Sequence, residues 1–308
     1  MSQVLSRRAD MALSDLAANG GLLTVEQSDT FIRNVIDQPT IIRQLRTVPM
    51  AGPSREMPKI GIGSRMLRAA SQTSGSRSLT EEQRTKPTTG NVKLETSEVI
   101  AEVRLPYEVL EDNIERGNME QTILALIAER AALDLEELIL RGDKSSSDTY
   151  LKLQDGVLKR LTSHVVDGTG LGVTSDIFNN TVLALPTRYR RNRQQMRFFV
   201  PSDIEQKYRH DQSKRMTGLG DSTLTGLNAL PLFGSGMEAA AMLPDDVGIY
   251  TNPKNILFGI QRNIRMETDK DITAREVIIV LTSRIAINIE EELAAVKMTN
   301  LGKAKLGG

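Results

Sequence analysis

The chain is 308 residues long and carries 39 basic and 39 acidic side chains, so its formal net charge is zero at pH 7. The chain has no cysteine, which excludes disulfides, thiolate metal sites and cysteine nucleophiles. It has two histidines, too few to build a histidine cage for a metal ion. No run of about 18 apolar residues is present, and residues 1–20 lack the apolar core of a secretory signal, so we expect no membrane span and a cytosol-like compartment.

The first half of the chain predicts an arm, a long hairpin and a long helix. Residues 24–36 carry a capping box followed by apolar residues at helical spacing. Residues 59–63 and 91–105 alternate like strands around a polar stretch, which predicts an extended β-hairpin. Such a hairpin is only marginally stable alone and should lie on another surface. From Asn118 to Gly142, caps and an apolar face predict a helix of about 23 residues.

The second half mixes helices and strands irregularly, which is typical of an α+β protein rather than of a doubly wound sheet. Residues 176–185 predict a helix, and residues 197–201 predict a buried strand. Residues 255–267 alternate as a strand. Residues 275–289 give the strongest strand pattern, and the apolar run Val277–Leu281 predicts burial on both of its faces.

Charge is balanced overall but not locally. Residues 46–77 hold six basic residues and one acidic residue, residues 95–143 hold four basic and thirteen acidic residues, and residues 188–215 hold nine basic and three acidic residues. Blocks of opposite sign attract each other, so the basic hairpin predicts an acidic resting surface. The alternative is that these blocks are unevenly charged faces in solvent. Among the arginines of residues 188–197, no aromatic residue interleaves beyond Tyr189, which favours a contact between subunits over specific binding of nucleic acid.

The motifs of the common enzyme classes are missing. The sequence has no phosphate-binding loop, no dinucleotide fingerprint, no zinc-protease motif and no nucleophile elbow. A carboxylate-based enzyme around Asp245, Asp246 or Glu290 is the remaining catalytic alternative. We therefore predict no catalytic residue, no cofactor and no metal site.

Three segments carry a resemblance to a known family: Gly20-Gly21-Leu22-Leu23-Thr24 with Phe31-Ile32, then Arg46–Met50, and then Lys59–Arg65. With these segments and its order of elements, the chain resembles the major capsid protein of tailed bacteriophages, which has the Hong Kong 97-type fold. The resemblance covers nearly the whole chain. It implies an N-terminal arm (1–45), an extended hairpin loop (46–93), a peripheral domain with a long spine helix (94–143), an axial domain (144–253), and returning strands with a C-terminal tail (254–308).

In shells of this family the extended loop lies across the peripheral domain of a neighbouring subunit. The resemblance implies contact with another copy for the extended loop and the acidic region, and local charge predicts it for the basic cluster. The extended loop contributes Arg55, Lys59, Arg65, Arg68 and Arg77. The acidic region contributes Glu95, Glu98, Glu102, Glu108, Glu111, Asp112 and Glu115, and a basic cluster contributes Arg188, Arg190, Arg191 and Arg193.

The function implied by the resemblance is structural. Copies of the chain would self-assemble into pentamers and hexamers of an icosahedral phage head, formed in the host cytoplasm and enclosing double-stranded DNA without reading its sequence. The implied partners are a portal and a separate scaffold or decoration protein. Because the helical arm already begins by about residue 24, any scaffold would be a separate protein, or none is needed. An encapsulin-type nanocompartment with an enzyme cargo is the alternative on the same fold.

Overall fold

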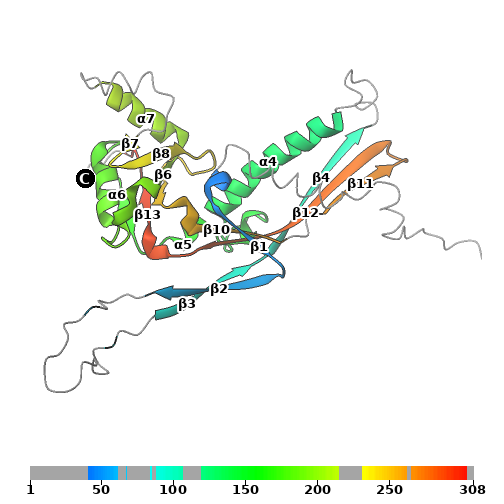
Figure 1. The fold of residues 1–308 in the computed structure, drawn as a ribbon. Coiled ribbons are helices and arrows are strands. Elements are labelled where there is room, and N and C mark those ends of the chain that lie inside the picture. Colours follow the sequence, from blue (N-terminus) through cyan, green and yellow to red (C-terminus); the bar gives the residue numbers. More distant parts are fainter. Residues whose placement is uncertain are drawn as a thin grey trace, which may run out of the picture.

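In the computed structural model the described residues are 41–61, 67, 84, 88–106, 119–214, 231–261 and 265–303. They form an α+β fold (Figure 1). The strands are β1 (Arg46–Met50), β2 (Ser54–Gly61), β3 (Thr88–Glu95), β4 (Ser97–Pro106), β5 (Val165–Asp167), β6 (Arg197–Val200), β7 (Pro231–Leu232), β8 (Ser235–Ala239), β9 (Gly248–Thr251), β10 (Ile256–Gln261), β11 (Arg265–Asp271), β12 (Glu276–Ile289) and β13 (Ala295–Thr299). The α-helices are α4 (Met119–Arg141), α5 (Val157–Arg160), α6 (Ser175–Ala184) and α7 (Ser202–Ser213), and the 3-10 helices are η1 (Ile41–Gln44), η3 (Leu151–Leu153), η4 (Arg190–Gln195), η5 (Pro253–Asn255) and η6 (Glu292–Ala294).

The strands form two larger sheets and one separate hairpin. In the first sheet, β12 pairs with β4 on one side and with β11 and β10 on the other, and β1 runs parallel to β10. The second sheet has the order β5-β13-β9-β6-β8-β7, and the hairpin pairs β2 with β3. Because β12 belongs to the first sheet and β13 to the second, residues 290–294 connect the two sheets.

The long helix α4 covers one face of the first sheet (Figure 1). It contains no glycine or proline, and an exposed ion pair of 3.1 Å joins Glu137 to Arg141 in its last turn. The predicted helix is confirmed in both bounds and length, at 23 residues. None of the helices in the described ranges is long and apolar enough to cross a bilayer. The buried cluster between the helix and the sheet comprises Ala128, Ala132, Ile279 and Leu281.

The strand predicted for residues 91–105 is divided in the structure. Its first part, β3, pairs with β2 in the hairpin. Its second part, β4, leaves the hairpin after Thr96 and pairs with β12 along its whole length. The prediction of one continuous hairpin strand is therefore wrong, because an alternating pattern fixes the two faces of a strand but not its partner.

The predicted burial of Val277–Leu281 on both faces is also wrong for the single chain. Ile279 and Leu281 point toward α4 and are buried, with 5% and 7% exposure. Ile278 and Val280 point to the opposite face and are only half-buried. The apolar run thus has one face covered by the chain itself and one face available to a partner.

Glu136 is a buried carboxylate at the point where η1, α4 and the loop after β8 meet. It is 2% exposed, and its carboxylate accepts hydrogen bonds from the Ile41 amide at 3.1 Å and the Met242 amide at 3.5 Å. Burial raises the pKa of Glu136, and the backbone hydrogen bonds offset part of that rise. One side chain therefore joins the start of the described chain to the helix and to the second sheet.

Replacing Glu136 with glutamine is expected to remove a pH dependence from the free energy of unfolding. The folded-state pKa of Glu136 lies above its ordinary value of 4.5. The stability that Glu136 contributes is therefore fully present below pH 4.5 and is lost as the pH rises through the folded-state pKa. Glutamine does not titrate and keeps one acceptor oxygen. Urea titrations of dissociated subunits should show the wild type losing stability relative to Glu136→Gln as pH rises. Parallel pH profiles would contradict this assignment.

Candidate functional site

The base of the hairpin packs on its own chain. Met57 and Val92 contact a buried apolar cluster that includes Leu94, which is fully buried. The side-chain amide of Asn288 in β12 donates to the Lys93 carbonyl at 2.7 Å. The hairpin then projects from the end of the first sheet, away from α4 (Figure 1). Its base is thus anchored within the subunit.

Two of the five hairpin residues predicted to contact another copy lie in the described ranges. Arg55 is exposed, and its guanidinium donates to the Pro49 carbonyl of the same chain. The Lys59 ammonium forms an ion pair with Glu291, also of the same chain. Contact with another copy stays a prediction for this group. The members outside the described residues are Arg65, Arg68 and Arg77.

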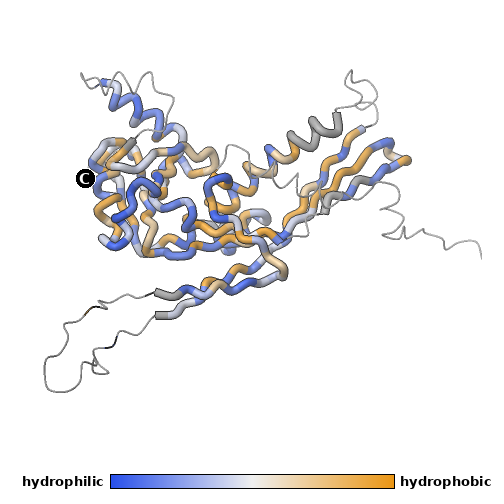
Figure 2. The backbone as a smooth tube through the Cα atoms, in the orientation of Figure 1, coloured by the Kyte–Doolittle hydropathy of each residue, from blue (hydrophilic) through white to orange (hydrophobic). Residues whose placement is uncertain are grey.

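The face of the first sheet opposite α4 is the second surface, which we name the outer sheet face. Ile100 lies on it and is 69% exposed. The register places Val280 beside Glu102, and Ile278 beside Arg104. Figure 2 shows how hydrophobic and hydrophilic residues mix along β4, β11 and β12. The outer sheet face comprises Glu98, Ile100, Glu102, Arg104, Pro106, Glu267, Asp269, Asp271, Glu276, Ile278, Val280, Thr282 and Arg284.

Acidic side chains surround the apolar residues of the outer sheet face. Glu98 pairs with Arg284 at 3.3 Å, and both side chains are about half exposed. Glu102 pairs with Arg104 at 2.6 Å and is similarly exposed. Exposed pairs of this kind hold their partners weakly, so these carboxylates remain available to another cation. A segment that offers both basic and apolar side chains is therefore the partner that this face fits.

Of the remaining predicted acidic residues, Glu95 is described, and it is not on the outer sheet face. Glu95 ends β3 and pairs with Lys93 at 2.6 Å. The hydrogen bond from Lys93 lowers the pKa of Glu95. The structure therefore brings Glu98 and Glu102 together on β4 but leaves Glu95 on the hairpin strand. The members outside the described residues are Glu108, Glu111, Asp112 and Glu115.

The predicted basic cluster lies in and just before η4. The Arg188 guanidinium stacks over the Tyr189 ring, 4.4 Å from its centre. Arg190 is half-buried and donates to the Thr187 hydroxyl at 3.2 Å. The exposed members present guanidinium groups to solvent and fit an anionic partner. These exposed members are Arg188, Arg191 and Arg193.

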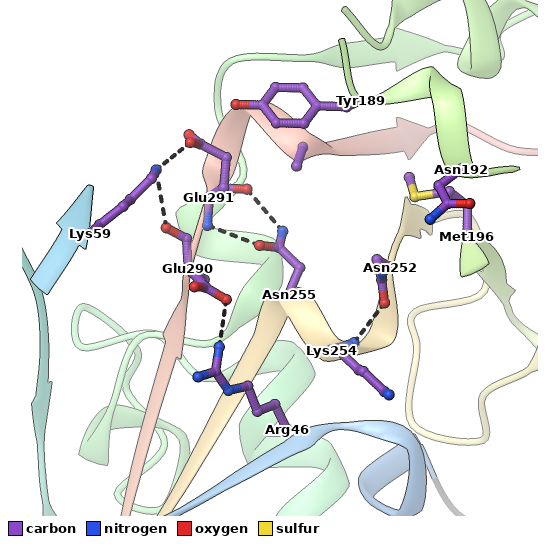
Figure 3. A pocket seen from close by; sticks show the side chains of 11 residues that line it. Arg46, Lys59, Tyr189, Asn192, Met196, Asn252, Lys254, Asn255, Glu290 and Glu291 are labelled. Atoms are coloured by element: carbon purple, nitrogen blue, oxygen red, sulfur yellow. Dashed lines mark hydrogen bonds and ion pairs between the residues drawn. The ribbon is translucent and has the colours of Figure 1, made fainter. Parts of the chain in front are cut away.

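A cavity of about 630 Å³ lies where the hairpin base, η4 and the connection between the two sheets meet (Figure 3). Across it, Arg46 of β1 pairs with Glu290 at 2.9 Å. Sequence reasoning did not find this site, because its residues come from five separate parts of the chain and no spacing relates them. Among the lining residues are Arg46, Lys59, Tyr189, Lys254, Glu290 and Glu291.

Two of the three carboxylates of the enzyme alternative pair with other side chains, and the third, Asp245, is exposed. Glu290 binds Arg46, and Asp246 binds Lys303. The neighbouring Glu292 accepts hydrogen bonds from Thr162, which lower its pKa to about 2. Within the described ranges, no group of three or more acidic or histidine side chains is placed to hold a metal ion. These contacts join segments of the fold to each other.

Comparisons with known proteins give one relative of nearly full length. No family model matches the chain. The prophage capsid protein YqbE of Bacillus subtilis (strain 168) is 41% identical over 312 residues, which cover 97% of this chain and 99% of YqbE.

Solved structures with very different sequences share the fold. The satellite phage P4 procapsid, which includes its size determination protein, gives a TM-score of 0.66 at 15% identity, covering 94% of this chain and 96% of that chain. A virus-like particle from Pyrococcus furiosus gives a TM-score of 0.55 at 10% identity, covering 88% and 96%. These two likenesses concern the fold alone, whereas the identity to YqbE extends over both sequences.

Proposed function

Because the chain belongs to the family of phage capsid proteins and is a structural subunit of a phage shell, we propose that its copies form the pentamers and hexamers of an icosahedral head around double-stranded DNA. The observation that carries this proposal is the 41% identity to a prophage capsid protein over 97% of the chain. The Hong Kong 97-type fold of the described residues agrees with it. In this proposal the subunit acts by assembly and performs no catalysis.

Within the shell, the hairpin of one copy rests on the outer sheet face of the next. Support comes from complementary charge and from the uncovered apolar residues. Residues 46–77 hold six basic residues and one acidic residue, while the outer sheet face places Glu98 and Glu102 around Ile100. Charge complementarity sets register and the rate of association, and burial of apolar area contributes most of the binding free energy.

The basic cluster of η4 provides a further contact with an anionic surface of another copy. Its exposed members, Arg188, Arg191 and Arg193, support this assignment. We also propose a portal, a separate scaffold or decoration protein, and non-specific packaged double-stranded DNA as partners, with assembly in the host cytoplasm. A nanocompartment shell with an enzyme cargo is the alternative, and the likeness to the Pyrococcus furiosus particle supports it only at the level of fold.

Expression of the chain is expected to give regular particles or capsomers, visible by negative-stain microscopy and by sedimentation velocity. Raising the salt concentration from about 0.1 M to about 1 M should slow their assembly, because the Debye length falls from about 10 Å to about 3 Å. Packaged DNA distinguishes the phage head from the nanocompartment, which would hold an enzyme. A stable, monodisperse monomer at high concentration would contradict the proposed function.

A further inference from the structure

Two consecutive residues after β12 contact β1 and the hairpin base of the same subunit. Glu290 and Glu291 follow β12 and line the cavity (Figure 3). Glu290 pairs with Arg46 of β1 at 2.9 Å. Glu291 pairs with Lys59 of β2, whose ammonium also donates to the Glu290 carbonyl at 3.5 Å. The first strand of the hairpin therefore meets the short connection between the two sheets.

The backbone that carries Glu291 is held in place by Asn255. Asn255 is 9% exposed, and its side-chain amide donates to the Glu291 carbonyl at 2.8 Å. Its side-chain oxygen accepts the Glu291 amide at 2.9 Å, and its backbone carbonyl accepts the Glu290 amide at 2.9 Å. These three hydrogen bonds fix the backbone of residues 290 and 291. The Glu291 carboxylate therefore extends toward the hairpin from a fixed backbone position.

Glu291 also contacts Tyr189, the residue that immediately precedes η4. Burial opposes ionisation of Glu291, but hydrogen bonds from Lys59 and Tyr189 lower its pKa overall, so the carboxylate is charged at neutral pH. The Lys59 and Glu291 side chains are 37% and 23% exposed, and a partly buried pair is screened less by salt than a surface pair. One carboxylate thus meets both the hairpin and the region before η4.

We propose that Glu291 is a positioning residue for assembly, which fixes the hairpin base to its own subunit through Lys59 and so sets the direction of the hairpin before a neighbour is met. Arg65, Arg68 and Arg77 follow β2 in the sequence, and the proposed function assigns them to the contact with a neighbouring copy. This inference rests on the proposed function, and it reassigns Lys59 from a contact between copies to a contact within one copy.

Paired cysteines test whether the contact lies within one chain, because the native chain has no cysteine. A Lys59→Cys, Glu291→Cys variant, treated as dissociated subunits with a short bismaleimide, should give a product of monomer size and one linked peptide pair by mass spectrometry. An Arg46→Cys, Glu290→Cys variant is the positive control. Covalent dimers as the main product would overturn the proposal, as would failure to crosslink while the control pair reacts. Shell formation plays no part in this measurement, so failure of the proposed function is detected separately by particle formation of the wild type.

Charge reversal tests whether the contact positions the hairpin. Glu291→Lys is expected to lower the yield of regular shells about tenfold, and adding Lys59→Glu to the same chain should restore most of it. Mixing chains that carry only one reversal each should not restore the yield, because the pair lies within one chain. Rescue by mixing, or a normal yield from Glu291→Lys alone, would overturn the proposal.

The matched control for these reversals is Lys254→Glu. Lys254 lines the same cavity but forms no ion pair with any described residue, so its reversal is expected to leave the shell yield unchanged. Thermal unfolding of each variant subunit separates loss of positioning from loss of folding. A tenfold loss of yield from Lys254→Glu as well would mean that cavity charge, and not the Glu291 pair, governs assembly, and would overturn the proposal.

Discussion

Reversing Glu98 and Glu102 to arginine is expected to abolish the formation of shells without unfolding the subunit. Both carboxylates lie on the outer sheet face, and their exposed pairs with Arg284 and Arg104 contribute little to subunit stability. In the proposed shell this face meets a basic hairpin at every copy, so the repulsion is repeated at each contact. We expect the particle yield to fall by at least about tenfold.

Sedimentation velocity and negative-stain microscopy measure this loss, and circular dichroism with urea titration checks the fold. Glu129→Arg is the matched control, because Glu129 is exposed on α4, which lies on the other side of the sheet. Adding Arg65→Glu and Arg68→Glu to the reversed chain should restore part of the yield, since the charges become complementary again. Normal particles from the chain with only Glu98 and Glu102 reversed would show that the charge argument is wrong.

Replacing Gly156 with alanine is expected to destabilise the subunit by about 3 kcal/mol. Gly156 precedes α5 and lies against Gly142, which follows α4, and its amide donates to the Gly142 carbonyl at 2.8 Å. A Cβ atom on Gly156 would lie 2.7 Å from the Gly142 nitrogen and 2.7 Å from the Ile139 carbonyl oxygen. Because these are backbone atoms, the end of α4 itself would have to move.

Urea denaturation of the dissociated subunit measures this loss of stability. Gly90→Ala in β3 is the matched control, since a Cβ atom there would meet no other atom within 4 Å. Alanine in an open strand position is expected to be neutral or slightly stabilising. A change below about 0.5 kcal/mol at Gly156 would contradict the close backbone contact.

Helix α4 was predictable because all of its determinants are local. Its apolar face repeats at helical spacing, no residue within it breaks a helix, and Gly142 follows its last residue. The same holds for β12, whose bounds of Glu276–Ile289 differ by one residue from the predicted 275–289. Where the residues that determine a helix or strand are neighbours in the chain, the sequence pattern alone is sufficient to predict its bounds.

Strand pairing was not predictable in the same way. The pattern over residues 91–105 correctly indicated strand, but the structure assigns β3 to the hairpin and β4 to the first sheet. The partner of β4 is β12, at least 170 residues later in the chain, and nothing in the alternation of β4 identifies it. This pairing places Ile278 and Val280 on the outer sheet face, where the chain itself leaves them only half-buried.

The candidate contact surfaces were also predictable only in part. Local counts of charged residues indicated which segments are basic and which are acidic. Only the register shows that Glu102 shares a face with Val280 and Glu267, and that Glu95 does not. The partner of Lys59 was also beyond local reasoning, because Glu291 lies at the end of a strand in a different sheet.

The sequence by itself determined the mixed α+β class, the long helix, the strongest strands and the alternation of charge along the chain, because each depends on residues that are neighbours in sequence. Only the tertiary structure decided which acidic side chains form one surface, which apolar face stays uncovered, and how the hairpin base is held. These features depend on contacts between residues far apart in the chain, and such contacts are selected by packing of the whole subunit rather than by any local pattern.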